Sequence, residues 1–295
     1  MISSPISEPF ADWLDVTFPP ESGVLDHVHM FFDALLCPVA WESEDRVCID
    51  AEGGKVFLDR SKRFCRVSVS GGVLKFLRSV GQFHDLLSVM GSEPHKVTRL
   101  DVACDYAVDT PRVLDWLDTK YPDDRVQLQR KAIKVTRLLS RREDGELTGT
   151  WYAGHRSNAR VTARVYDKQH EALEQRGETL PPRTRVELTF RKDHGCTLRD
   201  AAMPVSLYYQ FASPALVERP VDAPEWVSHA EGWEGTPPDT KLPYEVFKRR
   251  LETSPELARL AELANQMGPG ARALLIRAFT DRLGSADLPE TGTGS

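Results

Sequence analysis

A tyrosine flanked by two cations is the feature of this sequence that most directly suggests chemistry. It is Tyr166, in the stretch RVYDK that begins at Arg164, within residues 150–190. Side chains alternate between the faces of a β-strand, so a strand here places Arg164, Tyr166 and Lys168 on one side. A phenol with fixed cations at i−2 and i+2 suits either a nucleophile that attacks as phenolate or a seat for a phosphate group.

Two further segments combine one apolar side with one side of acids and arginines. Alternation groups Arg99, Asp101 and Asp105 within residues 98–105, and Arg183, Arg185 and Glu187 within residues 183–190. The opposite sides are apolar in both segments and suit a core. We expect the polar sides of the three strands to converge on one site.

Charge is distributed unevenly along the chain. The net charge is −6 over 295 residues, which by itself argues against a nucleic-acid-binding protein. Residues 125–170 nevertheless contain eleven Lys or Arg against four Asp or Glu. A basic segment in an acidic protein is typical of a localised contact with a phosphate backbone, and a solvated charged face is the alternative.

The composition is that of an ordinary globular protein, with 41% apolar and 28% charged residues. No apolar run is long enough to span a bilayer, and no signal peptide is evident at the start, so we expect no membrane association. The five cysteines are scattered and include no CxxC pair. This pattern favours a reducing cytoplasm and argues against a cysteine-based metal site.

Three blocks of the sequence closely resemble the Rep_trans family of replication initiation factors, which serve rolling-circle plasmids, filamentous phages and some conjugative elements. The blocks are TRLDVACD (98–105), WYAGHRSNARVTARVYDK (151–168) and RTRVELTFRKD (183–193). They occur in the family's order and at similar spacing, and the match is strong over roughly residues 95–193. The opening Asp12-Trp13-Leu14 matches more weakly, and residues beyond 200 match only loosely. Each motif alone is weak, and the three in order make the match specific.

The alternating strand and helix patterns and, more strongly, this resemblance predict an α+β fold. We expect curved antiparallel sheets in two similar halves, residues 10–110 and 111–200, with helices packed on one side. The second half would be catalytic and would share its site with strand 98–106. A disordered start (1–9), a helix and linker (201–243), C-terminal helices (244–285) and a disordered tail (286–295) complete the predicted organisation.

The resemblance implies a DNA nickase and strand transferase that initiates rolling-circle replication. Family members attack one strand of an origin with the tyrosine of this motif, here Tyr166, and remain attached to the 5′ phosphate. Arg164 and Lys168 would favour the ionised phenol, whose unperturbed pKa is near ~10. Mg²⁺ or Mn²⁺ would be held by Asp101 and Glu187, with Asp105 as a further ligand.

The implied partner is origin DNA, single-stranded or in a hairpin, together with a host helicase; a homodimer is left open. Arg99 and Arg185 would clamp the phosphate. The flanking backbone and bases would be bound by Arg156, Arg160, Arg130, Lys131, Lys134 and Tyr152.

Several alternatives stay open at this point. Asp101 and Glu187 can instead form cross-strand salt bridges, and Tyr152 can be core packing. His27-Val28-His29, with Tyr244 and Lys248, fits the motifs of the HUH endonucleases, although the two histidines lie in a helical pattern. A conjugative relaxase, an origin-binding regulator that does not cut DNA, and a structural or protein-partner module are the other functional alternatives.

Overall fold

The computed structural model describes residues 2–128, 132–142, 145, 147–154, 159–191, 194–213, 215–226, 262 and 266. Chain contacts divide the protein into one unit of residues 1–239 and a second of residues 240–295. The predicted linker after residue 226, the C-terminal helices apart from Glu262 and Gln266, and the predicted tail lie outside the described residues.

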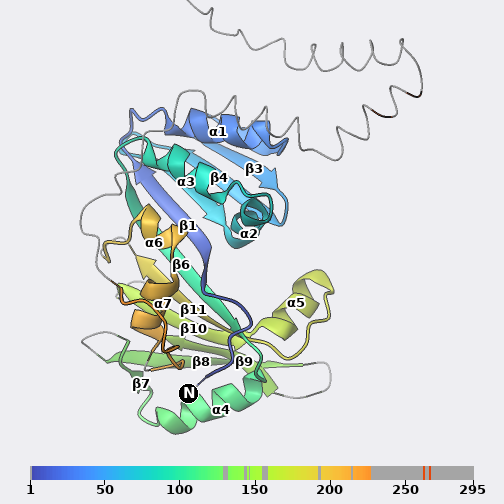
Figure 1. Ribbon diagram of the computed structural model, residues 1–295, viewed down its shortest axis with the longest axis vertical. Coiled ribbons are helices and arrows are strands. Elements are labelled where there is room, and N and C mark those ends of the chain that lie inside the picture. Colours follow the sequence, from blue (N-terminus) through green and yellow to red (C-terminus); the bar gives the residue numbers. More distant parts are fainter. Residues whose placement is uncertain are drawn as a thin grey trace, which may run out of the picture. The chain divides into compact units, whose positions relative to one another are not determined.

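In the described residues the chain forms eleven strands and seven helices (Figure 1). The strands are β1 (Phe10–Phe18), β2 (Val39–Ser43), β3 (Arg46–Ala51), β4 (Gly54–Arg60), β5 (Cys65–Ser70), β6 (Lys96–Tyr106), β7 (Arg125–Val126), β8 (Ile133–Arg141), β9 (Leu147–Ala153), β10 (Val161–Asp167) and β11 (Thr184–Arg191). The helices are α1 (Val24–Ala34), α2 (Gly71–Ser79), α3 (Phe83–Gly91), α4 (Thr110–Lys120), α5 (Lys168–Arg176), α6 (Leu198–Ala202) and α7 (Val205–Ala212). None of these helices is long and apolar enough to cross a membrane.

All eleven strands join one sheet in the order β2-β3-β4-β5-β1-β6-β11-β10-β9-β8-β7, and every neighbouring pair is antiparallel. β1 is followed by α1 and a meander whose last strand, β5, returns to pair with β1. β6 is followed by α4 and by the meander β7 to β10. Helix α5 then connects β10 to β11, which returns to pair with β6. The predicted α+β class with antiparallel sheets is confirmed.

Strand β6, which ends the first predicted half (10–110), takes part in both halves of the sheet. Strand β6 begins the second meander and pairs with β11, yet it also pairs with β1 and so joins the two units into one sheet. Figure 1 shows β1 and β6 running side by side through the middle of the sheet. Sequence patterns locate strands but not their pairing partners, so the pairing of β1 with β6 could not be predicted from them.

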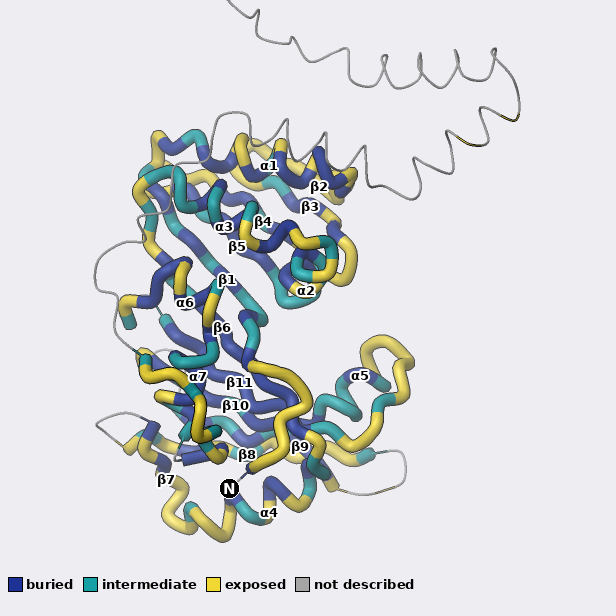
Figure 2. Tube along the Cα trace, in the orientation of Figure 1, coloured by how far each residue is buried: buried dark blue, intermediate teal, exposed yellow. Residues whose placement is uncertain are grey.

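The sheet has one apolar and one polar face, as the strand alternation predicts. Leu14, Leu100, Val102 and Leu188 are fully buried on the apolar face, and Figure 2 shows burial running along β1, β6 and β11. α7 packs on this face, where Phe211 lies edge-on to Phe190 with ring centroids 5.4 Å apart. Tyr121 follows α4 as its C-cap residue, and its ring centroid lies 6.1 Å from that of Trp151 on β9.

Residues 2–7 differ from the predicted disordered start, because they are hydrogen-bonded to the body of the protein. Ile2 is buried and forms a parallel bridge with Val217, and Pro5 forms a bridge with Tyr106. The Ile6 amide donates to the carbonyl oxygen of Asp105 at 2.8 Å. The composition of this stretch suggested disorder, but backbone hydrogen bonds to distant segments need no particular side chains.

Two elements of the first half are not evident from the sequence pattern. Residues 71–91 form two helices, α2 and α3, separated at Gly81, which has a φ of +73° that an L side chain rarely adopts. The edge strand β2 was not predicted; all five of its residues are exposed, so no alternation marked it. None of the five cysteines forms a disulfide, and all five are buried.

Candidate active site

The register of β6, β11 and β10 brings the three predicted polar faces together. Tyr166 lies opposite Arg185, and Arg164 lies opposite Glu187. On the other side of β11, Arg185 lies opposite Asp105, and Thr189 lies opposite Asp101. Residues directly opposite each other in an antiparallel pair share a face. The expected convergence of these side chains on one face of the sheet is therefore what the structure shows.

Tyr166 sits among cations on this polar face and is only 5% exposed. The guanidinium carbon of Arg164 lies 4.7 Å from the centre of the phenol ring, and Lys168 Nζ lies 5.8 Å from it. Burial raises the pKa of Tyr166 above its ordinary value, while the charges of Arg185 and Arg164 oppose that shift. The charge of Arg164 favours the phenolate, as expected, but the cost of removing that charge from water is larger, so the pKa is raised overall.

Each acid of the predicted metal pair is engaged by an arginine. Arg164 Nη2 donates to Glu187 Oε2 at 2.5 Å, and Arg99 Nε donates to Asp101 Oδ1 at 2.9 Å. Both acids are 2% exposed. Burial raises the pKa of Glu187 to about 7; Arg164 opposes this shift, and the charges of Asp101 and Asp12 add to it. Three carboxylates therefore repel one another at this position despite the adjacent arginines.

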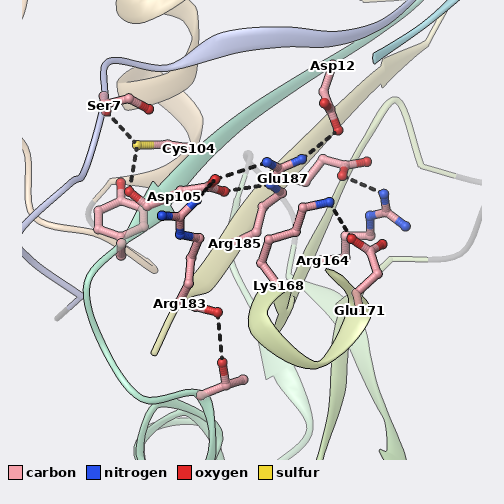
Figure 3. Close-up of polar contacts among 12 residues, drawn as sticks. Ser7, Asp12, Cys104, Asp105, Arg164, Lys168, Glu171, Arg183, Arg185 and Glu187 are labelled. Atoms are coloured by element: carbon pink, nitrogen blue, oxygen red, sulfur yellow. Dashed lines mark hydrogen bonds and ion pairs between the residues drawn. The ribbon is translucent and has the colours of Figure 1, made fainter. Parts of the chain in front are cut away.

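The carboxylates of Asp12, Asp101 and Glu187 form the acid group of this site, and Asp105 is not part of it. Its carboxylate accepts two hydrogen bonds from Arg185, from Nε at 2.6 Å and from Nη2 at 3.0 Å. Arg185 also donates from Nη1 to Asp12 Oδ2 at 3.2 Å, so the guanidinium lies between the two acids (Figure 3). Arg185 is 8% exposed, and this engagement makes it part of the framework rather than a free clamp for phosphate.

Asp12 was not among the predicted site residues. It lies at an irregularity in the pairing of β1 with β6, between Ala11 and Trp13, which places its side chain beside the acids of β6 and β11. Burial raises the pKa of Asp12, opposed first by Arg185 and then by Lys168 and Arg164. Gly71 makes room for it, since a Cβ there would come within 2.4 Å of the Asp12 carbonyl oxygen. The only sequence signal was the weak match of its Asp-Trp-Leu opening.

The acid group fits a hard divalent cation in composition but not in its present arrangement. Among the described residues, no three His, Cys, Asp or Glu side chains are placed to hold a metal ion together. Asp12, Asp101 and Glu187 nevertheless supply oxygen ligands within electrostatic range of one another. Glu187 and Asp101 would have to exchange their arginine partners for the ion, whereas Asp105 would have to leave a buried bidentate pair.

A network behind the tyrosine fixes the start of α5. Asp167 caps this helix by accepting from the His170 amide at 3.0 Å, and its other oxygen accepts from Thr148 Oγ1 and Arg142 Nε, each at 2.8 Å. Lys168, the first residue of α5, pairs with Glu171. Because Asp167 is adjacent to Tyr166, the same contacts determine where the phenol and Lys168 stand.

The predicted DNA contacts are only partly described. Tyr152 of β9 lies opposite Arg164 on the polar face and is half-buried, and Lys134 and Arg160 are exposed. Arg130, Lys131 and Arg156 lie outside the described residues. The basic segment is less cationic than its sequence suggests, since Arg137 pairs with Asp118.

The HUH alternative is not supported by the residues that can be compared. His27 and His29 lie in helix α1, not on a strand of the sheet. Residues two apart on a helix point in different directions, so the pair cannot present two nitrogens to one ion. Tyr244 and Lys248 lie outside the described residues.

No protein-family model matches the chain, and no curated protein matches it. Among solved structures, it is similar to "Structure of Rolling Circle Replication Initiator Protein from Geobacillus stearothermophilus". The two chains are 19% identical, the alignment covers 73% of this chain and 88% of the other, and the TM-score is 0.48. This similarity concerns the arrangement of the backbone. Membership of the Rep_trans family stays a prediction from the motifs.

Proposed function

We propose that the protein nicks one DNA strand and holds its 5′ end as a phosphotyrosine, as an initiator of rolling-circle replication. The observation that carries this proposal is the position of Tyr166. Its phenol lies near three cations, Arg164, Lys168 and Arg185. The buried acids Asp101 and Glu187 lie on the same face of the sheet. Binding DNA requires only cations, whereas a nucleophile, cations and paired acids on one face suit phosphoryl transfer.

The proposed reaction exchanges one phosphoester for another. Tyr166 Oη attacks the phosphorus of the scissile phosphodiester and loses its proton, the bond from phosphorus to O3′ breaks, and the departing O3′ takes up a proton, so that no net proton is gained or lost. The products are a tyrosyl 5′-phosphodiester and a strand with a free 3′ hydroxyl, which can prime synthesis. The reverse attack, by a 3′ hydroxyl on the phosphotyrosine, restores the strand and frees the phenol.

Arg164 is the residue best placed to stabilise the negative charge that develops during this exchange. It contacts the ring of Tyr166 and the carboxylate of Glu187 simultaneously, and its buried Nε has no partner among the described residues. A phosphate oxygen could take that donor and stabilise the guanidinium as negative charge develops on phosphorus. Lys168 approaches the ring from the start of α5 and adds a second cation.

Asp101, Glu187 and Asp12 would hold Mg²⁺ or Mn²⁺. This set replaces the one predicted from sequence, because Asp105 is bound to Arg185. Such an ion would supply positive charge to the phosphoryl oxygens and would relieve the repulsion that raises the pKa of Glu187. Lys134, Arg160 and Tyr152 would bind the strand beyond the site. A host helicase, a second copy of this chain and a cytoplasmic location stay predictions.

The decisive test is covalent capture of DNA. The full chain is incubated with Mn²⁺ and fluorescent oligonucleotides that carry candidate origin hairpins, and protease-sensitive adducts are sought on denaturing gels. Tyr166→Phe should abolish the adduct and retain DNA binding. Tyr121→Phe, at a tyrosine that packs against Trp151 outside the site, serves as the matched control and should still form adducts. An adduct that survives Tyr166→Phe would disprove the assignment of the nucleophile.

The alternative of an origin-binding regulator predicts a different pair of results. Wild-type protein would then bind the hairpins in a salt-sensitive way but give no adduct with any of them, and Tyr166→Phe would change nothing. A conjugative relaxase would give the same adduct as a replication initiator. Those two roles differ in whether the nicked strand is extended by a polymerase or transferred.

A further inference from the structure

We infer that Trp13 is a stacking site for an unpaired nucleobase, on the flank of the acid group opposite Tyr152. The inference rests on the proposed function, since it concerns the DNA strand that the proposed site would cut. It goes beyond that function by assigning a ligand to a residue on β1, a strand outside the segments that carry the Tyr166 motifs.

The pairing of the strands places Trp13 in one diagonal band with the candidate active site. Trp13 lies directly opposite Asp101 across β1 and β6. Glu187 lies opposite Arg164 across β11 and β10, and Arg164 lies opposite Tyr152 across β10 and β9. Four intervals of about 4.8 Å separate β1 from β9, so the two aromatic residues lie about 19 Å apart across the sheet, with the acids between them. Tyr166 lies beside this band, two residues along β10 from Arg164. A strand laid across the band would therefore meet one aromatic ring on each side of the acid group, with Tyr166 beside its path.

The surroundings of the indole distinguish it from a core tryptophan. Its neighbours in sequence, Leu14 and Val16, point to the opposite face and are fully buried, whereas Trp13 is half-buried on the polar face. Its Nε1 donates to Asp15 Oδ1 at 2.6 Å, which fixes the plane of the ring. A ring that is already held in place loses little rotamer freedom when a flat ligand stacks on it.

Arg99 connects this ring to the acid group. Its guanidinium carbon lies 4.8 Å from the centre of the indole, and its Nε donates to Asp101 at 2.9 Å. Arg99 would therefore be affected both by a base that binds at the indole and by a rearrangement of Asp101. Stacked indole and guanidinium planes accept the π-face of any base, so the site would recognise an unpaired base without selecting its identity.

The test measures binding of a labelled oligothymidylate by the full chain, through anisotropy and through quenching of tryptophan fluorescence. Trp13→Ala should weaken binding by about 5- to 150-fold, the range typical of losing one base–aromatic stack. Trp13→Phe should retain most of the affinity yet lose most of the DNA-induced quenching. Trp41→Ala and Trp41→Phe are the controls, because Trp41 is 42% exposed on the edge strand β2; both should behave as wild type.

Each outcome separates this inference from the proposed function. Wild-type affinity and wild-type quenching in Trp13→Phe, together with unchanged affinity in Trp13→Ala, would overturn the stacking site and leave the nickase proposal standing. Absence of salt-sensitive binding by the wild type would overturn both. Should Trp13→Ala fail to fold, as judged by circular dichroism, the quenching of Trp13→Phe alone decides: retained quenching overturns the site, and lost quenching with retained affinity supports it.

Discussion

The buried acid Glu187 predicts a measurable link between pH and stability. Its side chain is 2% exposed, and its pKa is raised from 4.5 to about 7, chiefly by burial. The folded state therefore binds a proton more tightly than the unfolded chain does. Below pH 4.5 both states carry the proton, between 4.5 and 7 the free energy of unfolding falls as pH rises, and above 7 the full penalty applies.

The size of this effect on stability follows from the shift in the pKa of Glu187. At about 1.4 kcal/mol for each pH unit, a carboxyl whose pKa moves from 4.5 to about 7 destabilises the ionised protein by on the order of 3 kcal/mol. Of this, about 2 to 3 kcal/mol develops between pH 5 and pH 8. Glu187→Gln removes the titration. It also removes an ion pair, but the Arg164 side chain is 37% exposed and water can take up its charge.

Urea unfolding at pH 5 and pH 8 tests this reasoning through a difference between proteins. Wild type should lose about 2 to 3 kcal/mol more than Glu187→Gln over this interval. Glu178→Gln is the control, because that side chain is 52% exposed and pairs with a nearby arginine at the surface; it should follow wild type. Parallel pH profiles for wild type and Glu187→Gln would show that Glu187 titrates normally. The conclusion that burial and the neighbouring carboxylates destabilise ionised Glu187 would then be wrong.

Four other predictions follow from the site. Mn²⁺ at a hundredfold excess over its Kd should raise the free energy of unfolding of wild type by about 2.7 kcal/mol at pH 8, and should leave Glu187→Gln unchanged in the same titration. Arg185→Met should destabilise the fold by about 3 to 5 kcal/mol in urea, because it strands the buried Asp105 carboxylate; a loss below 1 kcal/mol would contradict the bidentate pair. Asp167→Ala should cost at least about 1 kcal/mol through the lost helix cap and slow adduct formation, whereas Asp167→Asn should restore most of both. The rate of adduct formation should rise with pH beyond 8, because burial keeps Tyr166 protonated at neutral pH; a plateau at pH 7 in single-turnover assays would show an ionised nucleophile.

The order of side chains along each strand was determined by the sequence alone. Alternation with a period of two assigned Tyr166 and Arg164 to one face of β10, and Glu187 and Arg185 to one face of β11, before any partner strand was known. Most elements within residues 10–212 were likewise predictable, because their apolar residues recur with a strand or helix period. These are local properties, set by covalent geometry, and they need no information about distant parts of the chain.

Only the tertiary structure decided which polar faces meet and what each charge does there. The pairing of β1 with β6 brought Asp12 and Trp13 to the acid group, although about ninety positions separate them from Asp101. The hydrogen bonds of Arg185 withdrew Asp105 from the predicted metal set. Burial outweighed the effect of the neighbouring cations on the pKa of Tyr166. Strand order, hydrogen-bond partners and desolvation all depend on long-range contacts, and a pattern confined to a few neighbouring residues carries no record of them.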